Sequence, residues 1–588
     1  MAKRFWSFTK GYRFLTLICP IMVFLDVIIE LKIPEAMGRV VDILYQLGAE
    51  GVDPTQIKKE IIIKLLEMLG LCLLTLVIGY IGSRCSAISS MGFGANLRRA
   101  LFGQIQDLSF ENIDKLKVSS LITRMTSDVS MIQNVYKNTI VTFIKGPFML
   151  VTALIYALNI SRDLSVAFIF ALPAIVIILA IMGVIAVPLV KKQLKITDKF
   201  NGVLRGNING IRVVKSFVRE EHEKQKFEEV NKEVMKMTVR TQMISLYLSP
   251  AVMFVIYGCM IFALWRGSDL IINSETGLTP GEMTTFVSYI SQVLSSLMMV
   301  LLVFLSMIMA KASMGRIGEI FKQEPAVNDK NADPEAKVAD GSIEFRNVSF
   351  KYSDSAVKNI LEDISFKVES GETIGIIGGT GSSKSTLVQL IPRLYDAGEG
   401  EVFVGGRNVK DYTFENLRSQ ISVVLQQSTL FSGSVMENIR WGDLNATDEE
   451  VMEAAKIAQA HEFISEFEKG YDTELGQGGN TVSGGQRQRL CIARAVLRKA
   501  KVLIFDDSTS AVDTATDAKI RTALRSEAFK DTTKIIIAQR ITSIMDADRI
   551  IVMDNGKIVG IGTHEELTKN NEIYNEIFVS QQEGVLAQ

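Results

Sequence analysis

Six long apolar runs in the first half of the chain constrain its fold more than any other feature. Each run approaches or exceeds the roughly 20 residues that a helix needs to cross a bilayer. An even number of spans returns the chain to the side on which it began. The sequence therefore predicts an all-α, multi-pass transmembrane domain, with spans near Phe14–Ile33, Ile61–Ile81, Ile140–Leu158, Leu164–Leu189, Leu246–Leu264 and Phe286–Ala310.

The connections between the spans differ in length and charge. Residues 85–137 and 190–242 are long and rich in Lys and Arg, whereas the links near 159–163 and 266–281 are short. Basic connections tend to stay in the cytoplasm, so the long ones are predicted to be cytoplasmic and the short ones external. The long connections also have amphipathic helical spacing, which predicts helices that continue far beyond the bilayer.

Charged side chains occur inside the first and third spans, where hydrocarbon makes them costly. Lys145 is expected to reach the interface or to pair within the membrane. For Asp26 and Glu30, pairing and a role in substrate binding are both open.

The second half of the 588-residue chain alternates strand-like and helix-like segments, as a soluble α/β domain does. A polar, Pro-bearing stretch separates the two halves. We expect a transmembrane domain at 1–322, a linker at 323–341 and a nucleotide-binding α/β domain at 342–588. The net charge of −1 provides no field that would attract nucleic acid, so no nucleic-acid partner is expected.

The segment ETIGIIGGTGSSKSTLVQL predicts a strand at 373–377, a loop at 378–383 and then a helix. Backbone N–H groups of such a loop, with the helix N-terminus, cradle phosphates. A lysine reaches the terminal phosphates and a serine holds Mg²⁺. The sequence therefore predicts a site for ATP and Mg²⁺, formed by Gly378, Gly381, Ser383, Lys384, Ser385 and Thr386.

Ser383 departs from the loop pattern G-x-x-G-x-G-K-[ST], in which this position is glycine. If the position requires a positive φ, a residue with a Cβ is strained there. We expect ATP to bind, but less tightly. Downstream, the strand VLIF ends at Asp506, and an acid at the end of a buried strand beside a phosphate loop is the usual Mg²⁺-linked carboxylate, the Walker B aspartate.

The segment TVSGGQRQRLCIARA, Thr481–Ala495, lies just before that strand and closely resembles the signature of ATP-binding-cassette (ABC) proteins. The resemblance covers nearly the whole chain, because six spans ahead of one cassette is the layout of half-size exporters. It implies a bacterial, multi-pass plasma-membrane protein with a cytoplasmic nucleotide-binding domain. It also implies an adenine-stacking role for Tyr352, a Q-loop and Mg²⁺ role for Gln426, a D-loop at Ser510–Asp513, and signature contacts to ATP from Ser483, Gly484, Gly485 and Gln486.

In the family's working model, two cassettes sandwich two ATP molecules, each held between one phosphate loop and the opposite signature. The membrane helices alternate between inward-open and outward-open shapes. By this resemblance, the segments around Phe110–Leu116 and Gly210–Phe217 are expected to contact the cassettes.

Two residues depart from what the family needs for hydrolysis. The glutamate that polarises the attacking water is Asp507 here, and the histidine that contacts the γ-phosphate is Gln539. One methylene fewer retracts the carboxylate by roughly 1.5 Å, and a misplacement on the order of 1 Å can cost about 100-fold in rate. Glutamine can hydrogen-bond but cannot shuttle a proton. The alternative interpretation is a conservative change with activity retained.

A homodimer would carry both substitutions at both ATP sites. We therefore expect a second, non-identical half-transporter that supplies the catalytic glutamate and the switch histidine, as in heterodimeric multidrug-type exporters. The substrate class implied is an amphipathic drug, lipid or peptide. Two alternatives remain: a homodimeric lipid flippase with slow hydrolysis, and a regulatory subunit that binds ATP without a direct part in turnover.

Overall fold

The computed structural model describes residues 2–46, 54–273, 277–352, 358–508 and 512–586. Its internal contacts divide the chain into two compact units. The first contains residues 1–105 and 119–322, and the second contains residues 106–118 and 323–588.

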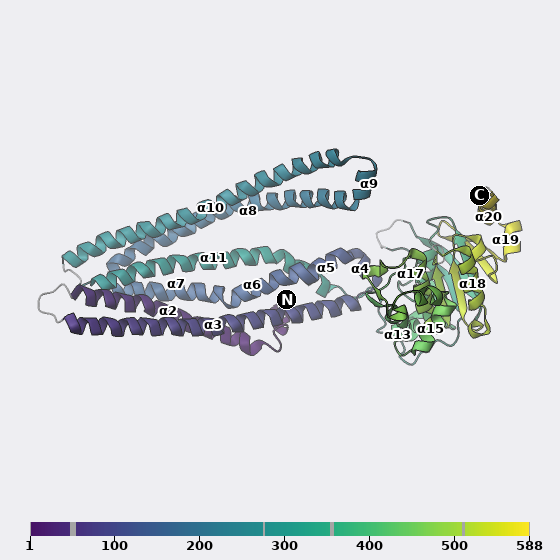
Figure 1. Ribbon diagram of the computed structural model, residues 1–588, viewed down its shortest axis with the longest axis horizontal. Coiled ribbons are helices and arrows are strands. Elements are labelled where there is room, and N and C mark those ends of the chain that lie inside the picture. The colour runs from purple at the N-terminus through teal and green to yellow at the C-terminus, as the bar shows by residue number, and fades with distance from the viewer. Residues whose placement is uncertain (1, 47–53, 274–276, 353–357, 509–511, 587–588) are drawn as a thin grey trace. The chain divides into compact units, whose positions relative to one another are not determined.

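The first unit is built from helices (Figure 1). Within the described residues, six helical stretches are long and apolar enough to cross a membrane, and they contain the six predicted runs. The predicted six-span architecture is therefore confirmed. The helices are α1 (Ala2–Ser7), α2 (Arg13–Gln46), α3 (Pro54–Asp107), α5 (Val118–Thr123), the π-helical η1 (Arg124–Asp128), α6 (Val129–Ile140), α7 (Thr142–Ile160), α8 (Arg162–Asn209), α9 (Ile211–Ser216), α10 (Glu220–Ile272) and α11 (Pro280–Lys322).

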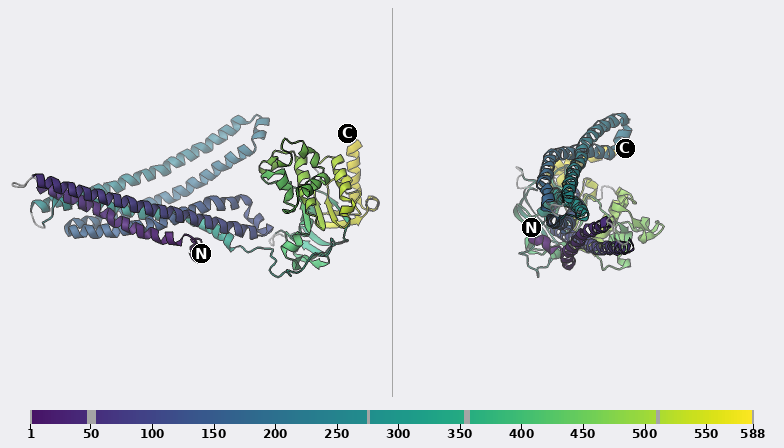
Figure 2. Two further views of the ribbon diagram at one scale, coloured as in Figure 1. Left: turned by 60° about the horizontal axis from the view of Figure 1, so that its bottom comes forward. Right: turned by 90° about the vertical axis from the view of Figure 1, so that its left-hand side faces the viewer.

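Several helices extend well beyond a membrane, as the amphipathic connections predicted. Helix α3 has 54 residues, which corresponds to about 80 Å at 1.5 Å per residue, against a hydrocarbon core of about 30 Å. Helices α8 and α10 pack against each other and are joined at one end by the short helix α9 (Figures 1 and 2). The pair diverges from α7 and α11 towards that end.

The charges inside the first and third spans pair with one another. Lys145 Nζ on α7 lies 2.9 Å from Asp26 Oδ2 and 2.9 Å from Glu30 Oε2, both on α2. One ammonium thus bridges two carboxylates one helical turn apart, so pairing within the membrane is what the structure contains.

A second ionic cluster joins α11 to the π-helical turn η1. Arg124 Nη2 lies 2.8 Å from Glu319 Oε2, and Arg316 Nε donates to Asp128 Oδ2 at 2.7 Å. Ser313 Oγ also donates to Asp128, at 2.8 Å. Arg124 and Asp128 are buried, whereas their partners Glu319 and Arg316 are exposed, so each ion pair that holds α11 against η1 has one desolvated member.

The second unit contains three sheets, in the strand orders β2-β1-β4-β5, β12-β11-β3-β10-β9-β6 and β7-β8. In the six-stranded sheet β11, β3, β10, β9 and β6 are parallel, and β12 is antiparallel at one edge. The strands are β1 (Ile343–Phe350), β2 (Leu361–Val368), β3 (Thr373–Gly378), β4 (Glu399–Val404), β5 (Arg407–Asn408), β6 (Ile421–Val424), β7 (Gly433–Ser434), β8 (Glu474–Leu475), β9 (Val502–Asp506), β10 (Thr533–Ile537), β11 (Arg549–Asp554) and β12 (Lys557–Gly562).

Helices surround the sheets of this unit. They are α4 (Phe110–Leu116), α12 (Lys384–Gln389), α13 (Phe414–Arg418), α14 (Val435–Arg440), α15 (Asp448–Ile457), α16 (His461–Ser465), α17 (Gly484–Leu497), α18 (Thr514–Leu524), α19 (His564–Asn570) and α20 (Glu572–Leu586). Short 3-10 turns are η2 (Val409–Asp411), η3 (Gly470–Asp472), η4 (Gln477–Gly479), η5 (Glu527–Phe529) and η6 (Ile541–Ser543). The predicted α/β class of this half is confirmed.

The sequence accounts for the central strands of the large sheet. Strand β9 is apolar up to Asp506 and β10 is apolar after Lys534, and every residue in both is buried, as expected for parallel strands covered on both faces. Their register pairs Asp506 with Ile537. Since parallel strands end at the same edge of a sheet, the residues that follow β3, β6, β9 and β10 gather there.

Candidate functional site

The phosphate loop follows β3 at this carboxyl edge. Gly378 ends the strand, and a Cβ at this position would clash with the carbonyl oxygen of Met553. Gly381 has φ +84°, a conformation that glycine adopts without strain. A Cβ at Gly379 would meet nothing within 4 Å, so neighbouring atoms of this chain give no reason for glycine there. The close approach of a phosphate to the backbone would be a reason for glycine at this position.

Ser383 has φ +71° and ψ +23°, the left-handed conformation, directly before the first residue of α12. Position 383, which is glycine in the loop pattern, therefore has the positive φ on which the expected strain depended. A serine in this conformation carries strain of order 1–2 kcal/mol that glycine avoids.

Lys384 folds back over the loop that precedes it. Its Nζ donates to the carbonyl oxygens of Gly378 and Gly379, each at 2.9 Å, and to Ser382 Oγ at 3.1 Å. Burial lowers the pKa of the Lys384 ammonium, although the nearby carboxylates of Asp507 and Asp506 oppose this change. Phosphates of an ATP bound in the loop would replace these carbonyl oxygens as partners of the ammonium.

Ser385 and Asp506 meet between α12 and β9. Ser385 Oγ donates to Asp506 Oδ1 at 2.7 Å, and Asp506 is buried. Burial raises the pKa of Asp506, and the hydrogen bond from Ser385 acts in the opposite direction. Hydroxyl and carboxylate oxygens are ligands that Mg²⁺ prefers, so Ser385 and Asp506 would suit a magnesium ion.

Asp507 lies at the centre of a small polar cluster that follows β6, β9 and β10. Gln539 Nε2 donates to Asp507 Oδ2 at 2.6 Å, and Gln426 Nε2 lies 3.5 Å from the same oxygen. Burial raises the pKa of Asp507, while the hydrogen bonds from Gln539 and Gln426 oppose the rise. One oxygen of the Asp507 carboxylate is thus bonded to the side-chain amide of Gln539.

Tyr352 lies beside the first turn of α12. Its Oη is 3.0 Å from Thr386 Oγ1, and its ring packs edge-on against Tyr395, with centroids 5.2 Å apart. Tyr352 is partly exposed, so a face of the ring is available to a planar base.

Helix α4, far away in the sequence, packs beside this tyrosine pair. Tyr395 Oη donates to Asp114 Oδ2 at 2.6 Å, and the rings of Phe110 and Tyr395 lie 6.4 Å apart. Asn112 accepts a hydrogen bond from the backbone N–H of Ala326 at 3.0 Å. The sequence predicted a contact segment here, but it gave no indication of Tyr395 or Asp114, which are 281 residues apart.

The signature segment opens helix α17. Ser483 is its N-cap: Ser483 Oγ accepts from Gln486 N at 3.2 Å, and Gln486 Oε1 accepts from Ser483 N at 2.9 Å. Ser483 and Gly484 are exposed, whereas Gly485 is half-buried. These two bonds of Ser483 both close on Gln486 within the same helix start.

The D-loop is only partly described. Ser510 and Ala511 lie outside the described residues. Asp513 Oδ1 accepts from Thr516 N at 2.9 Å and caps α18. Its carboxylate therefore has a helix-capping role in this chain.

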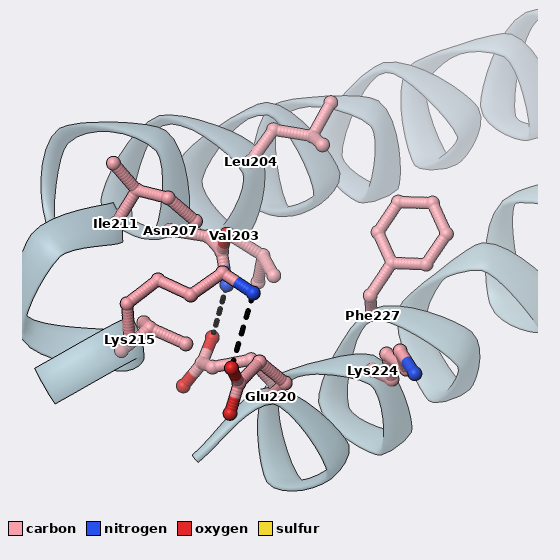
Figure 3. Close-up of a pocket in the computed structure, with 10 residues that line it drawn as sticks. Val203, Leu204, Asn207, Ile211, Lys215, Glu220, Lys224 and Phe227 are labelled. Atoms are coloured by element: carbon pink, nitrogen blue, oxygen red, sulfur yellow. Dashed lines mark hydrogen bonds and ion pairs between the residues drawn. The ribbon is translucent and has the colours of Figure 1, made fainter. Parts of the chain in front are cut away.

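Helix α9, the second predicted contact segment, closes the tip of the α8–α10 pair. A cavity of about 270 Å³ lies between the three helices and is lined by residues such as Leu204 and Phe227. Lys215 Nζ lies 3.1 Å from Glu220 Oε1, and Asn207 Nδ2 donates to Glu223 Oε2 at 3.1 Å (Figure 3). These polar contacts tie α8 and α9 to the start of α10.

Fold and site together define a class of protein: a multi-pass membrane protein whose transmembrane helices are continuous in sequence with a P-loop α/β nucleotide-binding domain. Residues 16–298 match the family described as ABC transporter transmembrane region, and residues 361–510 match the family described as ABC transporter. The chain is 34% identical over 98% of its length, and 98% of the relative's, to the ABC transporter ATP-binding protein YfiB of Bacillus subtilis.

Two other similarities point the same way. The chain is 32% identical over 98% of its length, and 99% of the relative's, to the putative multidrug export ATP-binding/permease protein YgaD of Bacillus subtilis. A solved bacterial Atm1-family ABC exporter with ATP bound superposes with a TM-score of 0.82 at 25% identity, covering 97% of this chain and 98% of that one.

The chain therefore belongs to the ABC transporter family, as a half-size exporter with a six-helix transmembrane region followed by an ABC nucleotide-binding domain. It is an ATP-binding ABC ATPase and a multi-pass membrane protein with bacterial relatives. As a half-transporter, it acts as a dimer in the membrane.

Proposed function

We propose that this chain is the degenerate-site subunit of a heterodimeric exporter that moves amphipathic drugs, lipids or peptides out of the cytoplasm by alternating access. Its own Walker motifs form the impaired ATP site, and its signature completes the competent site of a different half-transporter. The observation that carries the proposal is the 2.6 Å hydrogen bond from Gln539 to Asp507.

Two features of Asp507 impair hydrolysis: its hydrogen bond with Gln539 and its shorter side chain. A general base must accept a proton from water within hydrogen-bonding reach, and the amide of Gln539 competes with water for Asp507 Oδ2 and weakens it as a base. The carboxylate is also one methylene shorter than the family's glutamate, and a misplacement on the order of 1 Å can cost about 100-fold in rate. Neither Gln539 nor Gln426 can take over the proton.

The remaining groups of the site support ATP binding. We assign Mg²⁺ to Ser385, Asp506 and Gln426, and the phosphates to the loop that contains Gly378, Gly381, Ser383, Lys384, Ser385 and Thr386. The adenine is assigned to Tyr352. When bound, the magnesium ion neutralises the phosphate charge that the site must otherwise hold.

The signature supports a role outside the chain. Gly484 is the first residue of α17, and a Cβ there would meet nothing within 4 Å, so its neighbours in this chain do not require glycine. Glycine at this position permits close approach of something from outside, as a phosphate of an ATP bound to another cassette would approach. Ser483, Gly485 and Gln486 surround it, and Asp513 lies at the start of the next helix along the chain.

The tip of the α8–α10 pair supports contact with a partner chain. Val213, Phe217 and Val218 are 60%, 71% and 80% exposed, and apolar side chains grouped at a helix tip mark an interaction site. We assign residues 1–322 to the transmembrane domain, 323–341 to the linker and 342–588 to the nucleotide-binding domain, with residues 106–118 of the first range packed in the same compact unit as residues 323–588.

Purification of the chain with and without its partner tests the proposal. Alone, the chain should bind ATP but hydrolyse it at least about 100-fold more slowly than the assembled transporter. The double change Asp507→Glu with Gln539→His should shorten ATP retention at this site in the assembled transporter. Brisk hydrolysis and transport by the chain alone would instead identify a homodimer such as a lipid flippase.

A change at the signature separates composite catalysis from a regulatory role. Ser483→Ala should abolish most of the ATPase activity of the assembled transporter, because the competent site would lose a phosphate contact. The matched control Ser465→Ala alters an exposed serine whose hydroxyl donates to the carbonyl oxygen of His461. If Ser483→Ala left turnover unchanged, the chain would be an ATP-binding regulator.

A further inference from the structure

The C-terminal helix α20 contacts the segment that carries Gln539. Gln581 Nε2 donates to the carbonyl oxygen of Gln539 at 2.8 Å, and Gln581 Oε1 accepts from the N–H of Ile541 at 2.9 Å. One carboxamide thus bonds to the backbone on both sides of Arg540.

Gln581 contacts residues 539–541, which follow the end of strand β10. A hydrogen bond from Ala538 N to Ile376 O, at 3.2 Å, ties the chain to β3 directly before Gln539. Turn η6 then begins at Ile541, and its N-cap, Arg540, makes no side-chain capping bond. Gln581 supplies the missing cap from another helix, since its carbonyl oxygen takes the first N–H of the turn.

Helix α20 is itself firmly docked. Tyr574 is fully buried, its Oη lies 2.7 Å from His564 Nδ1, and Phe578 packs edge-on against the ring of His564. Ile573 and Ile577 pack against the core of the unit. Gln581 therefore projects from a docked helix. Its carboxamide fixes the backbone of Gln539 and Ile541 relative to that helix.

We propose that Gln581 is a positioning residue for the nucleotide site: through the backbone on either side of Arg540, helix α20 sets the place of the Gln539 side chain against Asp507. Position 539 is where the family contacts the γ-phosphate, so the docked C-terminal helix thereby contributes to how tightly this chain's own site holds ATP. This consequence rests on the proposed function, in which this site retains ATP.

A binding measurement tests the positioning role without depending on hydrolysis or on a partner. The probe is the magnesium complex of a non-hydrolysable ATP analogue with an imido β–γ bridge, bound to the purified full-length chain. Gln581→Leu removes both backbone bonds at similar volume and should raise Kd by up to about 10-fold, the limit reached if the free energy of one hydrogen bond passes in full to ATP binding. Gln582→Leu, at the exposed neighbouring position of the same helix, should leave Kd unchanged.

A double-mutant cycle distinguishes action through Gln539 from a general loss of structure. In a Gln539→Ala background, Gln581→Leu should have no further effect on Kd, because the side chain that it positions is gone. Equal Kd values for Gln581→Leu and the unaltered chain would overturn the proposal. So would a full additional effect in the Gln539→Ala background. The coupling between Gln581 and Gln539 would also appear in a homodimeric or rapidly hydrolysing protein. Loss of the coupling would therefore overturn the positioning role without deciding the proposed function.

Discussion

Tyr395 Oη donates a hydrogen bond of 2.6 Å to Asp114 Oδ2, and the same tyrosine ring packs edge-on against Tyr352 beside the phosphate loop. A single residue therefore contacts both the aromatic side chain assigned to adenine and the helix α4 that lies between two membrane-spanning stretches in sequence.

The bond from Tyr395 should hold α4 in place. A hydrogen bond to a charged group contributes about 1.5–3 kcal/mol, so Tyr395→Phe should speed amide hydrogen exchange in residues 106–118 by about tenfold or more. Tyr412→Phe is the matched control, because Tyr412 Oη donates to the carbonyl oxygen of Val404 in the four-stranded sheet and not to α4. Equal exchange in both variants would show that the bond does not anchor α4.

Ser383→Gly should relieve the left-handed strain at the end of the phosphate loop. Glycine recovers about 1–2 kcal/mol of strain and loses about 0.5–1 kcal/mol to backbone entropy, so we expect a net gain of up to about 1 kcal/mol and tighter ATP binding. The melting temperature with and without MgATP measures both. The neighbouring Ser382→Gly should not stabilise, since Ser382 is buried and accepts a bond from Lys384.

Lys145→Met should leave Asp26 and Glu30 as two uncompensated carboxylates within the membrane. Removal of one partner of a desolvated ion pair is strongly destabilising, and a loss of about 2–3 kcal/mol is expected from the bonds to charged groups. The detergent-solubilised protein should melt at a lower temperature. Adding Asp26→Asn and Glu30→Gln should restore much of the loss; no restoration would show that Lys145 acts through packing alone.

Asp507 should make stability depend on pH in the nucleotide-free protein. Burial raises the pKa of this carboxyl above the ordinary 3.8, so the folded protein binds its proton more tightly than the unfolded chain does. The ionised carboxylate consequently destabilises the fold, fully so above the raised pKa. Asp507→Asn should change little below pH 3.8 and stabilise progressively as the pH rises through the folded pKa. Melting curves across pH, compared with Asp513→Asn at the exposed cap of α18, measure this effect, and a pH-independent difference would contradict it.

Much of the fold follows from local patterns. The six membrane spans and the central strands are dominated by apolar residues, and Gly381 and Lys384 stand in the spacing of a phosphate-binding loop between a strand and a helix. The conditional expectation at Ser383 also follows, because a glycine position in a loop pattern indicates a positive φ.

The contacts around the site could not be predicted in the same way. Gln581 has no motif and stands 42 residues from Gln539, and only the docking of α20 brings them together. The pairing of Lys145 with Asp26 and Glu30 depends on how α2 and α7 pack. The sequence indicated that Asp507 and Gln539 were unusual, but their mutual hydrogen bond is a product of strand register.

Residues 106–118 belong to the same compact unit as residues 323–588, although more than 200 residues of membrane helices separate them in sequence. A cassette expressed from the linker onwards would lack α4, leaving the Tyr395 hydroxyl and the Ala326 amide without Asp114 and Asn112. Such a fragment would expose a surface that is covered in the intact polypeptide. Solubility, self-association and nucleotide affinity measured on this fragment would then be affected by the exposed surface. A fusion that adds residues 106–118 to the cassette would represent the intact unit better.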